Sequence, residues 1–366
     1  MDTGRLSPDS PPPAAGQWPG ECPLPTSRYD QIVLGHGSGG RLTADLVERL
    51  FLPAFGSPVL AELEDQATLS LPDDATGARL AFTTDAFVVR PIFFPGGDIG
   101  SLAIHGTVND LAVGGARPLW ISAAFILEEG LPLTDLRRIA LSMRRACDEA
   151  GVVLVAGDTK VVDRGKGDQV FIATSGIGLV PAGHKLSIHA AQPGDRVLLS
   201  GTIGDHGIAV LSVREGLAFE TVLESDSASL VDLARVIIEA CPTVRCMRDP
   251  TRGGLSSAVN ELAAASRVGV KLIESSIPLR PEVRAACELL GLDPLYVANE
   301  GKLIAVVPPD DAQRALAAMR SHPLGRQAAL IGEVVADHPG TVTLKSVVAG
   351  ERLVGLLSGE QLPRIC

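Results

Sequence analysis

The alternation of strand-like and helix-like apolar segments constrains the fold of this chain more than any other feature. Continuous runs such as residues 78–89 (ARLAFTTDAFVV) are typical of buried strands, whereas residues 133–151 repeat their apolar positions with helical spacing and end at a glycine. The pattern begins again after residues 181–184 with a second series of strand, glycine turn and helix. We therefore expect two successive units that each combine helices with a sheet.

Four segments follow from this pattern. Residues 1–28 are crowded with proline and lack the apolar centre of a signal peptide, so we expect a disordered extension there. A first domain is predicted for residues 29–182 and a second for residues 183–345, which leaves residues 346–366 as a carboxy-terminal tail that ends at Cys366. No apolar run reaches membrane-spanning length, so we expect no membrane partner.

Charge and cysteine content narrow the expected partners further. A net charge of -11 argues against binding to nucleic acid or an anionic membrane, because no broad face could neutralise phosphates. The 6 cysteines are scattered without a C-x-x-C pair, so we expect reduced thiols and a cytoplasmic location. A ligand that carries phosphate would then be held by backbone amides and by a metal ion bound to carboxylates.

Aspartates stand at the ends of several expected elements. They are Asp65, Asp85, Asp110, Asp158 and Asp249. Capping and turn formation explain most aspartates, but Asp110 lies near the carboxyl end of a predicted helix, where the helix dipole disfavours a negative charge. Asn109 beside it adds another oxygen ligand. Several carboxylates converging at strand ends are what Mg²⁺ needs when it also holds the phosphates of a nucleotide.

Two glycine-rich segments are candidate phosphate sites. Residues 35–40 (GHGSGG) would let backbone amides surround a phosphate, but no Gly-Lys-Ser/Thr follows, so this is not a Walker loop and a surface loop remains the alternative. In residues 249–263 (DPTRGGLSSAVNELA) the glycines open a predicted helix, whose amino end is a ready anion site. Thr251 and Arg252 could assist there.

Other polar residues carry weaker signals. Lys160 follows an apolar strand, where catalytic residues are common, and Glu300 lies between two strand-like segments with Lys302 close behind it. His36, in the first glycine loop, could contact phosphate. His105 falls within an apolar helical pattern, which is more typical of a packed histidine.

The order of these motifs resembles the HypE family of hydrogenase maturation factors, in the superfamily of aminoimidazole ribonucleotide synthetase and selenophosphate synthetase. The resemblance covers residues 31–366. Its motifs are HGSGG (36–40), FTTDAFVVRPIFFPGGDIG (82–100), GTVNDLAV (106–113), FILEEGLP (125–132), AGDTKVV (156–162), SGTIGDHG (200–207), MRDPTRGG (247–254), ANEGKL (298–303) and the terminal PRIC.

The resemblance implies a two-domain, PurM-like fold, α/β followed by α+β, whose amino-terminal sheet pairs with its twin across a homodimer. It also implies ATP in a cleft, with Mg²⁺ held by aspartates. The metal ligands carried over are Asp65, Asp85, Asp110 and Asp249. The residues carried over to the nucleotide site are His36, Gly37, Ser38, Gly39, Gly40, Asp85, Asn109, Asp158, Thr251 and Gly253.

The resemblance further implies a role for the terminal Cys366. Its thiol would receive a carbamoyl group from the carbamoyltransferase HypF, and dehydration would turn that group into a thiocyanate. The cyanide would pass to iron on the HypC–HypD complex, for the NiFe hydrogenase centre. Transfer of the γ-phosphoryl group of ATP would make the amide oxygen a good leaving group, with Mg²⁺ and Lys160 as cations and Glu300, tuned by Lys302, as the base.

Two other functions compete with this hypothesis. Another synthetase of the superfamily would also phosphorylate an amide oxygen, but it has no use for a terminal thiol. Selenophosphate synthetase would carry cysteine or selenocysteine in the first glycine loop, and residues 35–41 contain neither. A non-catalytic, ATP-responsive scaffold that offers Cys366 to a partner is the alternative from a different class, and turnover of ATP that depends on a carbamoylated terminus separates it from an enzyme.

Overall fold

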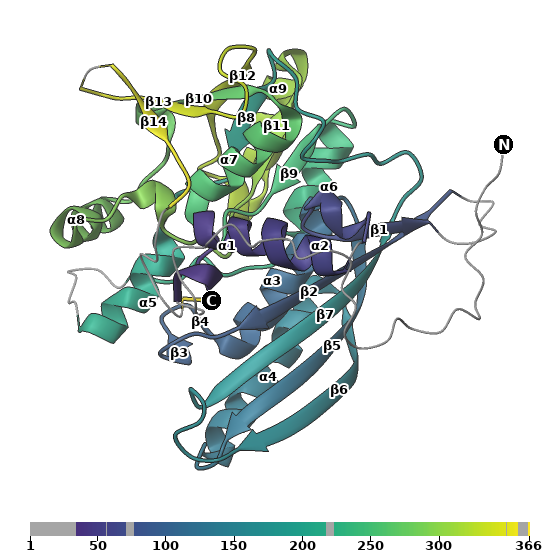
Figure 1. Cartoon of the computed structure of the whole chain (residues 1–366), viewed down its shortest axis with the longest axis vertical. Helices are drawn as coiled ribbons and strands as arrows, with labels where there is room; N and C mark the ends of the chain where they lie inside the picture. Colours follow the sequence, from purple (N-terminus) through teal and green to yellow (C-terminus); the bar gives the residue numbers. More distant parts are fainter. Residues whose placement is uncertain (1–33, 56, 71–76, 217–222, 349, 358–364) are drawn as a thin grey trace. The chain divides into compact units, whose positions relative to one another are not determined.

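The computed structural model describes residues 34–366 apart from residues 56, 71–76, 217–222, 349 and 358–364 (Figure 1). The predicted extension and Cys22 lie outside the described residues. Residues 34–366 form one compact unit, which contains two large sheets.

The first sheet has five strands in the order β1-β2-β7-β5-β6. Neighbouring strands are antiparallel except for β5 and β6, which are parallel. The bounds are β1 (Ala67–Ser70), β2 (Arg79–Phe87), β5 (Arg117–Glu128), β6 (Val153–Val162) and β7 (Val170–Val180), and a separate small hairpin joins β3 (Phe93–Phe94) to β4 (Gly97–Asp98). Asp85 lies within β2 rather than at its end, in register with Thr174 of β7.

Helix α3 (Ile99–Val113) is the central helix on this sheet, and α4 (Leu133–Ala150) packs beside it on the same face (Figure 1). Asp98 caps this helix, because its carboxylate accepts hydrogen bonds from the amides of Gly100 (2.8 Å) and Ser101 (3.1 Å). The helix ends at Val113, before Gly114. Asp110 therefore lies in the last turn of α3, near the carboxyl end where the sequence predicts it.

The second sheet has seven strands in the order β14-β13-β10-β12-β8-β11-β9. Its strands are β8 (Arg196–Leu199), β9 (Cys246–Arg248), β10 (Gly269–Ile273), β11 (Ile304–Val307), β12 (Ala329–Val335), β13 (Val342–Lys345) and β14 (Glu351–Val354). The helices that accompany it are α5 (Asp205–Glu215), α6 (Val231–Ala240), α7 (Gly254–Ser266), α8 (Pro281–Leu290) and α9 (Ala312–Ser321). Apolar residues on both faces of its strands make two separate parts of the core.

Short elements complete the described chain. They are η1 (Leu34–Gly37), α1 (Arg41–Leu46), η2 (Val47–Phe51), α2 (Leu52–Phe55), η3 (Leu60–Glu62), η4 (Glu274–Ser276), η5 (Pro294–Tyr296), η6 (Pro309–Asp311) and η7 (Pro323–Gly325). None of the described helices is both long and apolar enough to cross a membrane.

The end of the chain packs against the rest of the molecule. Strand β14, within residues 346–366, pairs antiparallel with β13 and so belongs to the second sheet. The side chain of Ile365 is buried, at 5% exposed, and Cys366 packs partly buried against the same apolar cluster. The predicted boundary near residue 182 falls between β7 and β8, and the domain limits stay a prediction.

Candidate active site

A cavity of about 300 Å³ gathers many of the residues singled out in the sequence. Its lining combines segments from both sheets. The predicted site residues that line it are Gly39, Asp65, Asp85, Asp110, Asp249, Thr251, Glu300 and Cys366. The volume lies at the lower end of the usual range for small-molecule sites.

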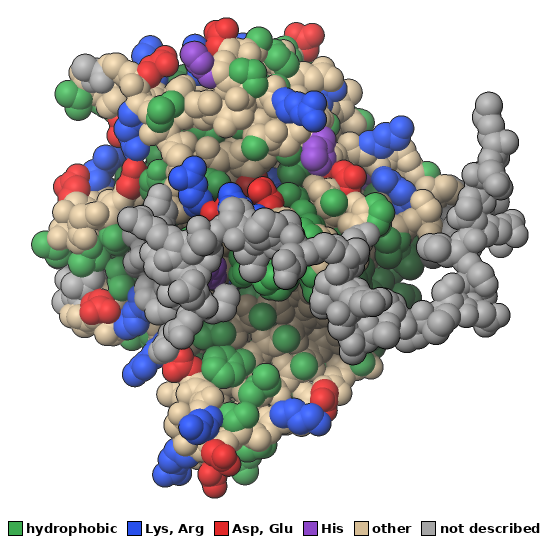
Figure 2. All heavy atoms as spheres, viewed as in Figure 1, with side chains coloured by type: hydrophobic (Ala, Val, Ile, Leu, Met, Phe, Trp, Pro, Cys, Tyr) green, Lys and Arg blue, Asp and Glu red, His purple; other side chains and the backbone are tan. Residues whose placement is uncertain are grey.

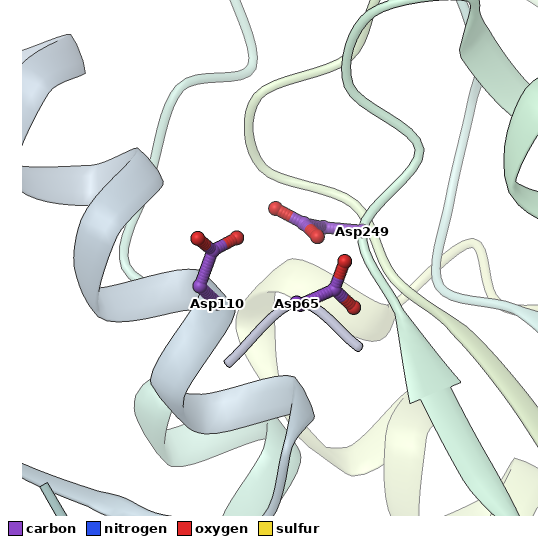
Figure 3. Close-up of side chains that lie close together, drawn as sticks. All are labelled: Asp65, Asp110 and Asp249. Atoms are coloured by element: carbon purple, nitrogen blue, oxygen red, sulfur yellow. The ribbon is translucent and has the colours of Figure 1, made fainter. Parts of the chain in front are cut away.

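Three carboxylates form a compact group in this cavity. Asp110 projects from α3, Asp249 follows β9, and Asp65 lies on the segment before β1 (Figure 3). One oxygen from each lies within 4.8 Å of the other two. Burial raises the pKa of Asp65 and of Asp110 well above the ordinary value, and the neighbouring carboxylates raise both further. Burial also raises the pKa of Asp249 to about 6.

This group is suited to Mg²⁺. Within the described residues, the guanidinium of Arg248 is the cation that pairs directly with the group, with Nε 3.0 Å from Asp65 Oδ2, and Arg248 also pairs with Glu261. Negative charge therefore exceeds positive charge in a buried space, and oxygen ligands at this spacing are those that Mg²⁺ prefers. Thr83 donates a hydrogen bond of 2.7 Å to Asp110 Oδ2 and orients that carboxylate.

Asp85 does not belong to the three-carboxylate group, although the resemblance implies a fourth metal ligand there. It lines the same cavity from β2. Burial raises its pKa, and Arg252 opposes the rise. Asp85 also acts electrostatically on Asp110 and Asp249, so it borders the group of three, and its role as a fourth ligand stays a prediction.

The chain terminus enters the same cavity. Cys366 and Glu300 both line this cavity, and a backbone oxygen of Cys366 accepts a hydrogen bond of 3.2 Å from Val88 N. Burial raises the pKa of the thiol, and Glu300 raises it further while Arg252 lowers it. Docked in this way, Cys366 is a neutral thiol that faces a carboxylate.

Glu300 has the surroundings of a general base or acid. Its side chain is 3% exposed, and Oε1 has no hydrogen-bond partner among the described residues. Burial raises its pKa well above the usual range, Asp249 and other nearby carboxylates raise it further, and Arg252 acts in the opposite direction. A carboxyl group with a raised pKa and a free oxygen beside a reacting group can exchange protons near neutral pH.

Asp226 fixes the backbone around Glu300. Its carboxylate accepts hydrogen bonds from the amides of Glu300 (3.2 Å) and Gly301 (3.4 Å), and it lies 2.9 Å from Nζ of Lys302. The ammonium group of Lys302 is therefore paired with Asp226, not with Glu300. The prediction that Lys302 tunes Glu300 directly is corrected: Lys302 neutralises the carboxylate that holds the Glu300 loop.

The two glycine-rich segments meet at the edge of the cavity. Ser257 Oγ donates to the carbonyl of Gly39 (2.9 Å), and Arg252 Nη1 donates to the carbonyl of Gly37 (3.3 Å). A Cβ on Gly39 would lie 2.7 Å from the carbonyl oxygen of Arg252, so this approach requires glycine. Gly253 has φ +76° at the start of α7, a second position where glycine is needed.

Several predicted nucleotide contacts do not line the cavity. From the first loop only Gly39 does so, and His36, Gly37, Ser38 and Gly40 lie beside it, as does Gly253 in the second. Asn109 is buried in a structural role, since its amide donates to the carbonyls of Ala228 (3.0 Å) and Glu300 (3.3 Å) and its oxygen accepts from Leu230 N. Its contact with a nucleotide stays a prediction.

Lys160 and Asp158 are also outside the cavity of their own chain. Both lie on β6, an edge strand, and their side chains are 74% and 68% exposed with Nζ 3.6 Å from Asp158 Oδ2. The sequence reasoning assumed that every strand end would contribute to one site. Because β6 is the edge strand, Asp158 and Lys160 are exposed instead of lining the cavity that β2 borders.

Sequence reasoning missed residues that support the site from a distance. Arg248 directly precedes a predicted ligand and could have been recognised as its partner. Asp226 and His206 gave no such signal, although His206 belongs to one of the motifs, because their partners lie far away in sequence. His105 is packed as predicted, and burial lowers its pKa to about 4.

Comparison with known proteins agrees with this arrangement. The N-terminal domain model of AIR synthase related proteins matches residues 63–180, and the C-terminal domain model matches residues 192–345. Carbamoyl dehydratase HypE of Azotobacter vinelandii is 57% identical over 339 residues, which cover 93% of this chain and 98% of that protein.

Solved structures are similar over most of the chain. A chain in the crystal structure of a HypE–HypF complex matches with a TM-score of 0.80 and 46% identity, and the match covers 85% of this chain and 99% of that one. A hydrogenase maturation protein HypE in complex with ATP matches with a TM-score of 0.76 and 47% identity over 92% of this chain and 100% of that one. The chain therefore belongs to the HypE family of carbamoyl dehydratases, the hydrogenase maturation proteins of the AIR synthase related superfamily.

Proposed function

We propose that this protein uses ATP to dehydrate a carbamoyl group carried on its own Cys366. The observation that carries the proposal is the meeting of the terminal thiol, Glu300 and the three-carboxylate group in one cavity. A frayed terminus or a passive scaffold would not need its last residue beside a buried, partly unpaired carboxylate.

The reaction balances without any further reagent. The oxygen of the S-carbamoyl group attacks the γ-phosphorus of ATP, the bond to ADP breaks, and one N–H proton leaves. Loss of the second N–H proton and departure of phosphate then convert the carbon–nitrogen double bond into the triple bond of the thiocyanate. Glu300 is proposed to accept these protons, since it lines the cavity together with Cys366 and its Oε1 has no hydrogen-bond partner among the described residues.

The charged residues of the cavity have distinct proposed tasks. Asp65, Asp110 and Asp249 would hold Mg²⁺, which when bound would neutralise the phosphates of ATP. Arg252, next to Cys366 and Asp85, supplies a fixed positive charge where negative charge grows on the transferred oxygen. Gly39 and the amino end of α7 provide close backbone approach for phosphate oxygens.

The exposed face of the first sheet is the proposed homodimer interface. Phe82, Trp120 and Ile126 are exposed, and Figure 2 shows hydrophobic side chains over the face where β2, β7, β5 and β6 lie in Figure 1. Exposed apolar area of this kind is typical of an interface. If Lys160 acts in catalysis, it must act from β6 of a second copy, since it does not reach the cavity of its own chain.

HypF is the proposed donor of the carbamoyl group, and the HypC–HypD complex is the proposed acceptor of cyanide. One solved relative was crystallised as a HypE–HypF complex, which supports the first of these partners. A cytoplasmic location stays a prediction from the sequence.

Mass spectrometry of the terminal peptide tests the proposed function. The protein is incubated with HypF, carbamoyl phosphate, ATP and Mg²⁺, and we expect the carbamoyl adduct on Cys366 to lose the mass of one water. Cys366→Ser is the matched control, and it should acquire no stable adduct. An adduct that persists unchanged with ATP and Mg²⁺ would contradict the assignment.

A further inference from the structure

We infer that His206 is a positioning residue that holds the chain terminus in the cavity by binding the backbone carbonyl of Ile365. His206 Nε2 lies 2.7 Å from this oxygen, and Nδ1 lies 2.7 Å from Ser225 Oγ. The imidazole sits near the start of α5, fully buried, at the only backbone group of Ile365 that can accept a hydrogen bond.

The hydrogen-bond pattern fixes the tautomer of His206. A carbonyl oxygen only accepts, so Nε2 must carry the proton and donate it to Ile365. Nδ1 is then the acceptor for the hydroxyl of Ser225, which is the arrangement of a neutral ring. Burial lowers the pKa of His206, with Asp226 opposing the shift, and the neutral form agrees with this pattern.

The neighbouring contacts make the terminus a built binding site. The ring of His206 meets the edge of Phe94, with centroids 5.4 Å apart and planes at 88°. The side chain of Ile365 is buried in the apolar cluster that includes Phe94, and Val88 N binds the carbonyl of Cys366. The last two residues are therefore held by one apolar anchor and two backbone hydrogen bonds.

Holding the terminus by its backbone leaves the thiol free. None of these contacts uses Sγ of Cys366, so the same contacts can hold the terminus with a free thiol, a carbamoyl group or a thiocyanate.

The segment around Ser225 also links His206 to the proposed base, Glu300. The backbone amide of Ser225 donates a hydrogen bond of 2.8 Å to the carbonyl of Pro95, and the carboxylate of the adjacent Asp226 accepts a hydrogen bond from the amide of Glu300. Residues 225–226 thus align the carrier and the base with each other.

Thiol labelling tests this inference without reference to catalysis. Wild-type protein and His206→Leu are pulsed with N-ethylmaleimide, and mass spectrometry follows each cysteine peptide. Loss of one neutral hydrogen bond lowers the docking equilibrium constant about fivefold, so labelling of Cys366 should become faster, by up to about fivefold for a terminus that is mostly docked. His206→Gln, whose amide nitrogen takes the place of Nε2, should restore labelling to near the wild-type rate. Cys147, Cys241, Cys246 and Cys287 are buried and free, and they serve as internal controls for folding.

Each outcome is decisive. Unchanged labelling of Cys366 in the leucine variant overturns the inference, and so does a glutamine variant that labels as fast as the leucine variant. If the internal cysteines of His206→Leu are labelled as well, the variant has lost its fold and Ser225→Ala replaces it. That variant should expose Cys366 alone, and a wild-type rate for Cys366 would overturn the inference.

A second measurement tests whether the hydrogen bond from His206 to Ile365 also affects dehydration. Only this measurement rests on the proposed function. Dehydration in a single turnover follows the docked fraction of the terminus, and labelling follows the undocked fraction. In His206→Leu the fold gain in labelling multiplied by the fold loss in dehydration rate should therefore be about five, with recovery in His206→Gln and unchanged affinity for ATP. Wild-type protein that fails to dehydrate would refute the proposed function and leave the labelling result intact. A product close to one would overturn the inference.

Discussion

Replacing Asp249 by asparagine should stabilise the metal-free protein and abolish its response to Mg²⁺. The substitution keeps the shape of the side chain and removes one of three buried charges that repel one another. A pKa raised from 3.8 to about 6 corresponds to roughly 3 kcal/mol of penalty for the ionised form in the folded protein. Loss of hydrogen bonds offsets part of this gain, so we expect a net effect of about 1 to 3 kcal/mol.

The sign of the pH dependence follows from the direction of the shift. The folded pKa of Asp249 lies above its unfolded value, so the folded state binds more protons between the two values and stability falls as pH rises through this interval. Below the unfolded pKa the penalty vanishes, and above the folded pKa it is complete. The asparagine variant should therefore differ little from wild type at pH 4 and be more stable at pH 8.

Urea unfolding at pH 4 and pH 8, with EDTA or with Mg²⁺, measures these differences. Wild type should gain stability from Mg²⁺ at pH 8, because the ion replaces repulsion by attraction, whereas Asp249→Asn should gain little. Asp310→Asn, on an exposed turn, is the matched control for loss of one negative charge. If Asp249→Asn loses stability at pH 8 without metal, or still responds to Mg²⁺ as wild type does, the three-carboxylate group is not a metal site.

Three further predictions concern the reaction. Glu300→Gln should accept the carbamoyl group normally but dehydrate it at least about a hundredfold more slowly. The wild-type rate should rise with pH through a pKa above the ordinary glutamate value, because the base must be ionised. Single-turnover rates across pH check both, and dehydration by the variant at the wild-type rate would assign the base to another residue. Adding one residue after Cys366 should abolish dehydration but spare ATP affinity, since the terminus lies inside the cavity and Val88 N already binds its backbone oxygen. Mass spectrometry and calorimetry measure the two properties, and normal dehydration would show that the cysteine need not be last. Mixing Lys160→Ala with Glu300→Gln should restore about a quarter of wild-type turnover if Lys160 acts across the interface. Half of the dimers then contain both variants, and one of the two sites in each of these dimers is intact. Turnover of the mixed sample equal to the mean of the two pure variants would exclude that arrangement.

Residues close together in the sequence predicted the helices and strands of this fold. Contacts between segments that are far apart in the sequence could not be predicted from them. The cap at Asp98 and the end of α3 follow from residues a few positions apart, so the sequence alone places Asp110 in the last turn. The meeting of Asp65 with Asp249 depends instead on how the two sheets pack, which no local pattern encodes. Lys160 shows the opposite failure: its motif was recognised, but whether β6 lies in the centre or at the edge of the sheet is a matter of strand order.

The site residues divide in the same way. Glu300 and Cys366 were found because the resemblance includes their motifs. The groups that hold them, Asp226 and His206, act on backbone atoms about 75 and 159 positions away, and backbone atoms leave no trace in a sequence. Support of this kind becomes visible only when the folded chain brings the segments together.

The hydrogen bond at Leu357 sets how far the carrier end can reach toward its targets. The carbonyl of Leu357 accepts a hydrogen bond of 3.0 Å from Arg41 N, and residues 358–365 separate this position from Cys366. Fully extended, such a tether spans at most about 30 Å, and a partner must bring its active site within that radius. A short tether keeps its end at an effective concentration on the order of millimolar, so a docking free energy of only about 4 kcal/mol fills the cavity half of the time. One backbone hydrogen bond, worth about 1 kcal/mol, then changes the docked fraction severalfold, while release to a partner stays fast.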